Sequence, residues 1–316
     1  MEMRKTERNM SGRKLGSLLS LAGVLVLIIA LFAVVMTAMG TRLDNQDPSA
    51  KDPSPAEVER QTLAQTVARI EVLAGERSAE LWTAVPLVDA SAQWNSVLGD
   101  VWVPWPDGPP EGYENPEINV TPSEISDTAL ITELYELSEA LIAAEELDPQ
   151  LATSMAASAR IYAYHLSVET GAGTANGDDI CGSVNYAALG ALTADESSLE
   201  IAETARQYFE FVAANTDPGN RFNEVARGEA VVNLVDAILE QGVADIRPTL
   251  VMLPEDPLFT GYQMLADHLI VLADDADAEQ RRAIVSFMCT ISTPGDAALD
   301  VYPTAFPGIT AEEFTD

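Results

Sequence analysis

An uninterrupted stretch without charged side chains, from Leu15 to Thr41, constrains this chain more than any other feature. Its most apolar part, Leu18 to Met39, is about 22 residues long and would form an α-helix of roughly 33 Å. That length is enough to cross a hydrocarbon core of about 30 Å. We therefore expect residues 15–41 to form a transmembrane signal-anchor helix that holds the protein in a lipid bilayer.

The charge on either side of this stretch predicts its orientation. Five basic residues lie before it, namely Arg4, Lys5, Arg8, Arg13 and Lys14. Basic flanks stay in the cytoplasm, so residues 1–14 are expected to be a cytoplasmic tail and the rest an extracytoplasmic domain. A cleavable signal peptide is the alternative, since Ala38 and Gly40 are small. The apolar region of such peptides usually has only about 7–15 residues, which favours a retained anchor.

The part of the chain after Arg42 is strongly acidic. It holds 48 of the 50 acidic residues and 11 of the 17 basic ones, a formal charge of −37. Nucleic-acid binding needs Lys and Arg side chains to neutralise phosphates, so this class of partner is excluded. The same field would attract cations or basic proteins. The charge predicts that a protein partner is basic, and the anchor predicts that this partner lies in or near the membrane.

The exported part divides into three regions by composition. Residues 42–55 form a polar, proline-containing linker, and residues 56–120 hold stalk helices and a Trp/Pro-rich loop. Residues 121–316 form the main helical domain with a Pro/aromatic C-terminal tail. Apolar residues recur every three or four positions, as Leu63, Val67 and Ile70 do, whereas alternating strand patterns are not found. We expect an all-α, bundle-like domain of seven to nine helices.

Capping residues predict where several helices begin. The segment Thr121–Glu124 combines a capping threonine, a first-turn proline and a glutamate that completes a capping box. The segment Asp148–Gly171 reads as one helix with an aspartate cap and a terminal glycine. Thr193–Glu196 has a second capping-box pattern. Further helix starts are predicted at Asp217, Asp256 and Asp277. Segments that are apolar around most of their circumference belong at the bundle centre, near residues 222–241, 258–272 and 284–291.

Cys181 and Cys289 are the only cysteines. Because an exported domain is not kept reduced, this pair predicts a disulfide. The alternatives are two unpaired buried thiols or, less consistent with the apolar surroundings of Cys289, a catalytic cysteine.

No residue pattern in the chain indicates catalysis or a cofactor. No Gly-x-Ser-x-Gly sequence is found, and the exported part contains no Ser-x-x-Lys sequence. The two histidines, His165 and His268, are too few for a zinc site of three or four ligands. A metal bound by His165 with Glu169 is a weak alternative to two packed histidines. Acidic clusters that could hold calcium, with Asn176, Asp178 and Asp179 or with Asp274, Asp275 and Asp277, lack the EF-hand pattern.

Aromatic residues next to prolines are the remaining candidates for recognition. All four tryptophans lie between Trp82 and Trp105, and the tail after Val301 combines Tyr302 and Phe306 with two prolines. Such rings can bind a partner, rest at a membrane interface, or pack against the bundle. As partner-docking residues we select Trp94, Trp102, Trp105, Tyr302 and Phe306.

Taken together, these features predict a non-enzymatic, membrane-anchored interaction protein. A scaffold or accessory subunit of a membrane or cell-envelope complex fits them best. An extracytoplasmic module that binds a small ligand or cation is the alternative. A hydrolase is the third hypothesis, and it requires carboxylates with raised pKa values in a cleft.

Overall fold

The computed structural model describes residues 53–99, 101–105, 108–177, 179–219, 221–292 and 304–309. The predicted span at residues 15–41 lies outside the described residues, as do the basic tail and most of the linker. Among the helices that are described, none is both long enough and apolar enough to cross a membrane. All described residues belong to one compact unit, Lys51–Asp316.

The described chain is all-α, as the sequence predicts, and holds nine α-helices and one short 3-10 turn. In order, the helices are α2 (Pro55–Arg77), α3 (Ala84–Leu98), α4 (Asp127–Ala143), α5 (Pro149–Thr170), α6 (Tyr186–Leu192), α7 (Glu196–Asn215), α8 (Arg221–Glu240), α9 (Pro257–Leu272) and α10 (Ala278–Ile291). The turn η1 (Ala273–Asp275) lies between α9 and α10.

Three of the predicted helix starts are confirmed. Asp148 caps α5 through its side chain, and the helix ends at Gly171, whose φ of 69° is a left-handed conformation that glycine adopts without steric cost. Asp256 caps α9 in the same way. Asp277 and Gln280 form a reciprocal capping box at the start of α10. In each case the carboxylate satisfies backbone N–H groups that have no partner within the helix.

Three other helix starts differ from the prediction. The helix expected at Thr121 begins instead at Asp127, with Ser126 as its N-cap. Thr193 ends α6, and Asp195 caps α7. No described helix begins at Asp217, because α8 starts at Arg221. In the first two cases the side chains of Ser126 and Asp195 accept the capping hydrogen bonds.

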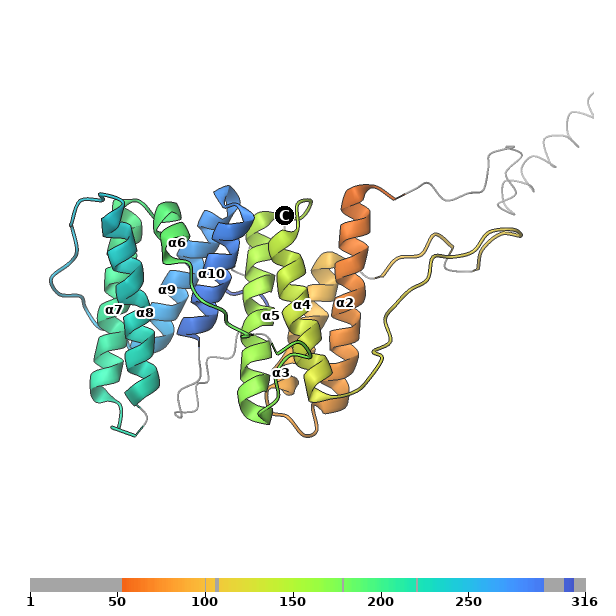
Figure 1. The fold of residues 1–316 in the computed structure, drawn as a ribbon, viewed down its shortest axis with the longest axis horizontal. Helices are drawn as coiled ribbons and strands as arrows, with labels where there is room; N and C mark the ends of the chain where they lie inside the picture. The colour runs from red at the N-terminus through yellow and green to blue at the C-terminus, as the bar shows by residue number, and fades with distance from the viewer. Residues whose placement is uncertain are drawn as a thin grey trace, which may run out of the picture. The chain divides into compact units, whose positions relative to one another are not determined.

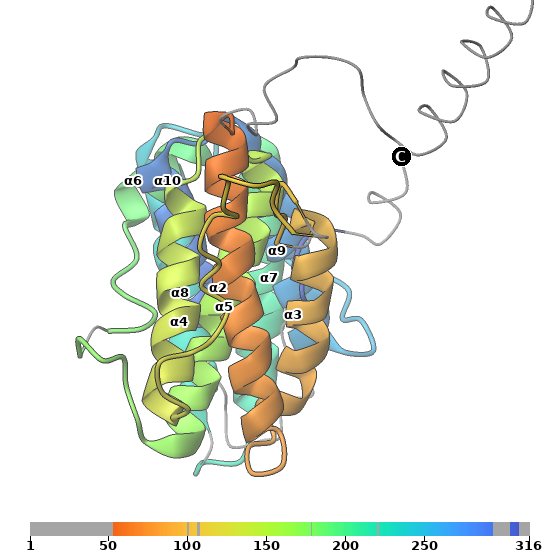
Figure 2. The ribbon, with the colours of Figure 1, turned by 90° about the vertical axis from the view of Figure 1, so that its right-hand side faces the viewer.

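The helices pack around one continuous apolar core. The predicted stripe of α2, including Leu63, Val67 and Ile70, is buried in it together with the leucine stripe of α4. Figure 2 shows α2 beside α3 and α4, the two helices on which it packs. Next, α4 packs on α5, and α5 contacts α10. Helices α6, α7, α8 and α9 form the other end of the unit in Figure 1.

The C-terminal described segment folds back into the core. The indole N–H of the fully buried Trp94 donates to the Ala305 carbonyl oxygen at 2.8 Å. Ser154 and Ser158 of α5 donate to two further carbonyl oxygens of the segment, each at 2.7 Å. The Phe306 side chain is also buried. A buried indole needs an acceptor, and this segment supplies it.

The predicted disulfide is present. Cys181, in the connection after α5, is bonded to Cys289 of α10, with a Cα–Cα distance of 5.4 Å and 108 residues of sequence separation. Ile161 packs beside it in a small apolar cluster. The bond therefore fastens the connection between α5 and α6 to the helix that contacts α5.

Candidate functional site

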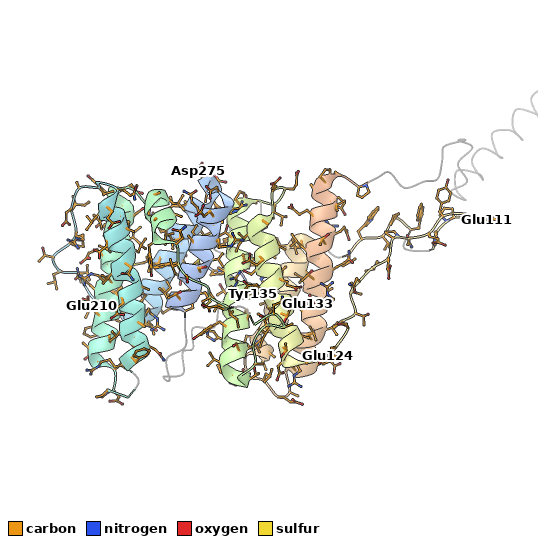
Figure 3. All side chains as sticks on the ribbon, viewed as in Figure 1. Glu111, Glu124, Glu133, Tyr135, Glu210 and Asp275 are labelled. Carbon is orange, nitrogen blue, oxygen red and sulfur yellow. A yellow bond between two sulfur atoms is a disulfide. The ribbon has the colours of Figure 1, made fainter. Side chains whose placement is uncertain are left out.

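The Trp/Pro-rich connection between α3 and α4 forms a projection that we call the aromatic arm, residues 101–105 and 108–120. Figure 1 shows it extending away from the helices, and Glu111 marks its far end in Figure 3. The arm exposes 53% of Trp102 and 39% of Ile118. Large apolar side chains on such a projection are typical of a recognition surface.

The base of the arm is fixed to α2 by hydrogen bonds to its main chain. The Gln61 side-chain oxygen accepts from the backbone N–H of Trp102 at 3.2 Å. One turn later, the Gln65 oxygen accepts from the Asn119 N–H at 2.8 Å. After another turn, Arg69 donates to the Asn119 carbonyl oxygen at 2.8 Å. The i, i+4, i+8 spacing places these three side chains on one face of α2, so both ends of the arm are positioned by one helix.

The outer part of the arm has its own internal contacts. The Asn115 side chain accepts from the Trp105 N–H at 3.1 Å and donates to the Trp105 carbonyl oxygen at 2.8 Å. The rings of Trp105 and Tyr113 pack with centroids 5.7 Å apart. A turn follows in which Gly112 has a φ of 86°, a conformation that suits glycine. These contacts order the two legs of the arm against each other.

The five docking residues selected from sequence therefore have different environments. Trp102 and Trp105 lie in the arm, with Trp102 exposed and Trp105 half-buried. Trp94 and Phe306 are buried, so in this fold neither ring is exposed to a partner. Their rings fill the core instead, which was the third interpretation of these aromatics. Tyr302 lies outside the described residues.

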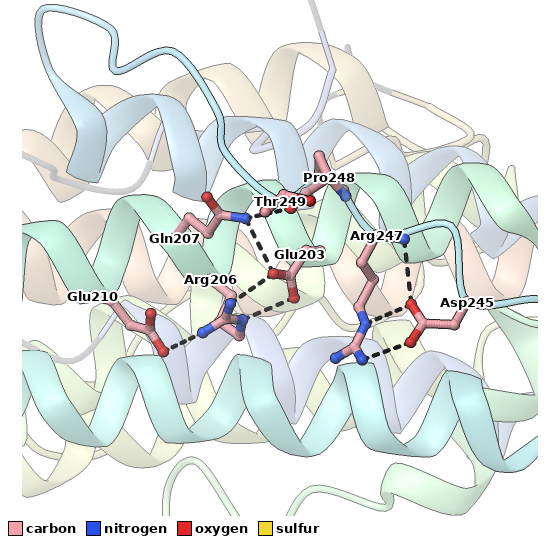
Figure 4. A pocket seen from close by; sticks show the side chains of 8 residues that line it. All are labelled: Glu203, Arg206, Gln207, Glu210, Asp245, Arg247, Pro248 and Thr249. Carbon is pink, nitrogen blue, oxygen red and sulfur yellow. Dashed lines mark hydrogen bonds and ion pairs between the residues drawn. The ribbon is translucent and has the colours of Figure 1, made fainter.

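A second candidate site is a charged hollow of about 510 Å³ along α7. It is lined by Glu203, Arg206, Gln207, Glu210, Asp245, Arg247, Pro248 and Thr249. Figure 4 shows the charged side chains as two groups, one on α7 and one on the connection between α8 and α9.

Every guanidinium of this hollow is already paired with a carboxylate. Arg206 binds both oxygens of Glu203, at 2.6 and 2.8 Å, and also contacts Glu210. Arg247 binds both oxygens of Asp245 at 2.8 Å. Bidentate pairs of this kind have a fixed geometry and favour the charged form of both partners.

The electrostatics of the hollow do not suit proton transfer. Burial opposes ionisation of Glu203, but hydrogen bonds from Arg206 and Gln207 outweigh it and hold the pKa of this carboxyl below its ordinary value. The Arg247 hydrogen bonds lower the pKa of Asp245 to about 2. A general acid or base needs a pKa near the working pH, whereas these two carboxylates stay ionised at neutral pH. The hollow is suited to binding charged groups.

One Ser/His/Asp group lies at the start of α7. The Ser198 hydroxyl is 2.7 Å from His268 Nε2 and 2.6 Å from Asp195 Oδ2. In a catalytic triad the aspartate contacts the imidazole, which in turn contacts the serine. Here the serine is in the middle, is 2% exposed, and Asp195 also caps the helix. Asp195 and Ser198 therefore form a helix cap, and His268 contacts this cap through the Ser198 hydroxyl.

Three of the residues considered for metal binding, His165, Glu169 and Asp277, have structural partners. Glu169 accepts hydrogen bonds from the backbone N–H groups of Trp82 and Thr83, at 2.9 and 3.2 Å. His165 is buried, with Nε2 3.2 Å from the Ser292 carbonyl oxygen. Asp277 is the N-cap of α10. Across the described ranges, no three His, Cys, Asp or Glu side chains are grouped as metal ligands.

Sequence reasoning did not find the charged hollow. Its α7 residues recur at i, i+3, i+4 and i+7, a pattern that predicts only one solvated helix face. The remaining residues lie about 40 positions later, in a segment without periodicity. Only the folded chain brings the two together.

Comparison with known proteins identifies no relative of this chain. No protein-family model matches the chain, and neither a curated protein nor a solved structure is significantly similar to it.

Proposed function

We propose that this chain is a non-enzymatic, membrane-anchored interaction protein that binds a protein partner through the aromatic arm. It would serve as a scaffold or accessory subunit of a membrane or cell-envelope complex, with its N-terminus in the cytoplasm. The observation that carries the proposal is the exposed Trp102 on a projection whose base is hydrogen-bonded to α2. Preorganised aromatic side chains bind with little loss of conformational entropy.

The position of the arm in the chain supports a partner near the membrane. Helix α2 begins at Pro55, and the predicted span ends at Thr41. The intervening residues reach at most about 45 Å when fully extended. A partner bound to the arm would therefore stay within reach of the bilayer.

The charge of the arm favours a basic partner. Glu111, Glu114 and Glu117 are exposed on the same arm as the exposed Trp102 and Ile118. Complementary charge speeds association and excludes acidic competitors, while a buried tryptophan supplies most of the affinity.

The experiment compares two tryptophans with equal exposure. Trp102 is 53% exposed, and Trp82, in the connection between α2 and α3, is 52% exposed. The full chain would be purified in mild detergent with Trp102→Ala or Trp82→Ala. We expect Trp102→Ala to reduce the recovery of a stoichiometric membrane partner by about 30-fold, the value for a hot-spot residue worth about 2 kcal/mol.

The Trp82→Ala variant is expected to retain the partner at the wild-type level. A photo-crosslinking residue at position 102 should then join the chain to this partner, and one at position 82 should not. Recovery of the wild-type protein alone, or equal recovery by both alanine variants, would contradict the proposal.

A second function is favoured by the charged hollow. A small zwitterionic ligand would meet guanidinium and carboxylate groups within one volume of about 510 Å³. This supports the small-ligand alternative, although the hollow lies on α7 rather than beside Trp102 and Trp105. A thermal shift with charged amino acids, lost in Arg247→Gln, would support it.

A further inference from the structure

A second surface lies on α7 and α8, away from the aromatic arm. Helix α7 presents Glu203, Arg206, Glu210 and Ala213 along one face, at the spacing of successive helical turns. The first three line the charged hollow. Glu210 also lines a groove between α7 and α8, so the two depressions are neighbours that share this residue.

This groove has an apolar floor and an acidic rim. Ala213, Val225, Gly228 and Val232 provide the apolar part, and the exposed Glu210 and Glu229 provide the rim carboxylates. Glu224 also lines the groove but is buried. Its volume is about 180 Å³. A methyl group built on Gly228 would meet no atom within 4 Å, which confirms that the space next to this glycine is open.

The three carboxylates differ in how far they are neutralised. Glu224 is buried and paired with Arg227, and Glu210 is paired with Arg206. Glu229 is exposed, and it forms no ion pair in the described part of the chain. No basic side chain lines the groove itself. Its rim therefore retains negative charge above an apolar floor.

An apolar floor with an acidic rim matches a long cationic side chain. The stems of Lys and Arg pack on apolar surface, while their charged ends stay at the rim near water or a carboxylate. The net charge of −33 makes a second copy of this chain an unfavourable occupant, because the two would repel each other.

An exposed apolar segment lies next to the same face. Leu250 is 86% exposed and Met252 is 91% exposed, in the connection between α8 and α9. Pro248 and Thr249 of this connection line the charged hollow. A polypeptide that runs from the groove to this segment could contact the charged residues of the hollow and then the exposed side chains of Leu250 and Met252.

We propose that this face binds a basic, amphipathic segment of a partner protein and that the groove at Gly228 accepts one of its lysine or arginine side chains. The surface is separate from the aromatic arm, so the proposal does not depend on the function suggested above. Two attachment points on one tethered domain would raise the effective concentration of the second contact.

The test uses the full chain in mild detergent and a defined probe. The probe is a fluorescein-labelled peptide of twelve residues that repeats leucine, alanine, lysine and alanine. The matched peptide carries acetyl-lysine at each lysine, which keeps the stem and removes the charge. Fluorescence anisotropy should show at least tenfold tighter binding of the lysine peptide.

Two pairs of variants separate the groove from the general acidity of the domain. Gly228→Met fills the groove, and Gly75→Met places the same side chain at an open position of α2. Glu229→Gln removes a rim charge, and Glu200→Gln removes an exposed charge of α7 that lines neither depression. Helicity and melting temperature of all four verify folding.

We expect Gly228→Met to weaken binding of the lysine peptide at least tenfold and Glu229→Gln to weaken it about threefold. Gly75→Met and Glu200→Gln should stay within twofold of the wild type. Equal affinity of Gly228→Met and the wild type would overturn the proposal, since binding would then reflect acidity alone. Equal binding of the two peptides would overturn the assignment of a cationic side chain.

Discussion

Replacing Arg227 by methionine should destabilise the domain strongly. The Arg227 side chain is 1% exposed and that of Glu224 is 4% exposed, and the two form an ion pair within α8. Arg227 Nε also donates to the Ile291 carbonyl oxygen at the end of α10, at 2.5 Å. Methionine keeps the apolar volume but leaves a buried carboxylate without its counter-charge.

Breaking a buried ion pair by removing one partner costs about 3–5 kcal/mol. Replacing both partners by apolar residues is often neutral, because no uncompensated charge remains. The double variant Arg227→Met/Glu224→Leu still leaves the Ile291 carbonyl oxygen without its donor, at a cost of about 1–2 kcal/mol. The double variant should therefore be more stable than Arg227→Met alone by about 2 kcal/mol.

Urea unfolding followed by tryptophan fluorescence measures these free energies. Trp94 is fully buried, so its emission reports loss of the core. Arg282→Met is the control, because the Arg282 side chain is 50% exposed and pairs with Glu139 at the surface. An exposed pair contributes at most about 1 kcal/mol. A loss below about 1 kcal/mol in Arg227→Met, or a double variant less stable than the single one, would refute the reasoning.

Two further predictions concern the disulfide and pH. Replacing Cys181 and Cys289 by serine should lower the free energy of unfolding by about 4–5 kcal/mol for a loop of this length, and reduced wild-type protein should have the same urea midpoint. Burial lowers the pKa of His165, although its contact with a backbone carbonyl and the charge of Glu169 oppose this. The folded state therefore favours the neutral imidazole, and its stabilising contribution is complete above the ordinary value of 6.5 and is lost as the pH falls below it. Between pH 8 and pH 5.5, the wild type should lose more stability in urea titrations than His165→Gln does, and an equal loss would contradict this assignment.

The sequence predicted the helices better than their starting points. The stripes that contain Leu63 and Leu130 are buried, because apolar spacing depends on the helix alone. The start expected at Thr121 failed for a tertiary reason. Asn119 is bound to two side chains of α2, which hold the preceding segment outside the helix until Ser126. A local capping pattern contains no information about such contacts.

The candidate sites show the same limit. Trp102 was selected from its neighbouring prolines, and the structure places it on an exposed projection. Trp94 was selected as one of the four tryptophans between Trp82 and Trp105, yet its position in the apolar stripe of α3 buries it. Gly228 carried no signal in the sequence, because a small residue forms a groove only if the neighbouring helix also leaves space there.

The disulfide also determines how this domain would carry tension. A pulling force applied at its two ends would pass directly through the bond between Cys181 and Cys289. The segment between these two cysteines, which spans a sequence separation of 108 and includes α6, α7, α8 and α9, would then bear no load. The disulfide therefore prevents about 350–390 Å of chain from being extended by the force. The face of α7 and α8 would therefore stay folded while a pulling force unfolded α2, α3, α4 and α5, which lie outside the disulfide loop.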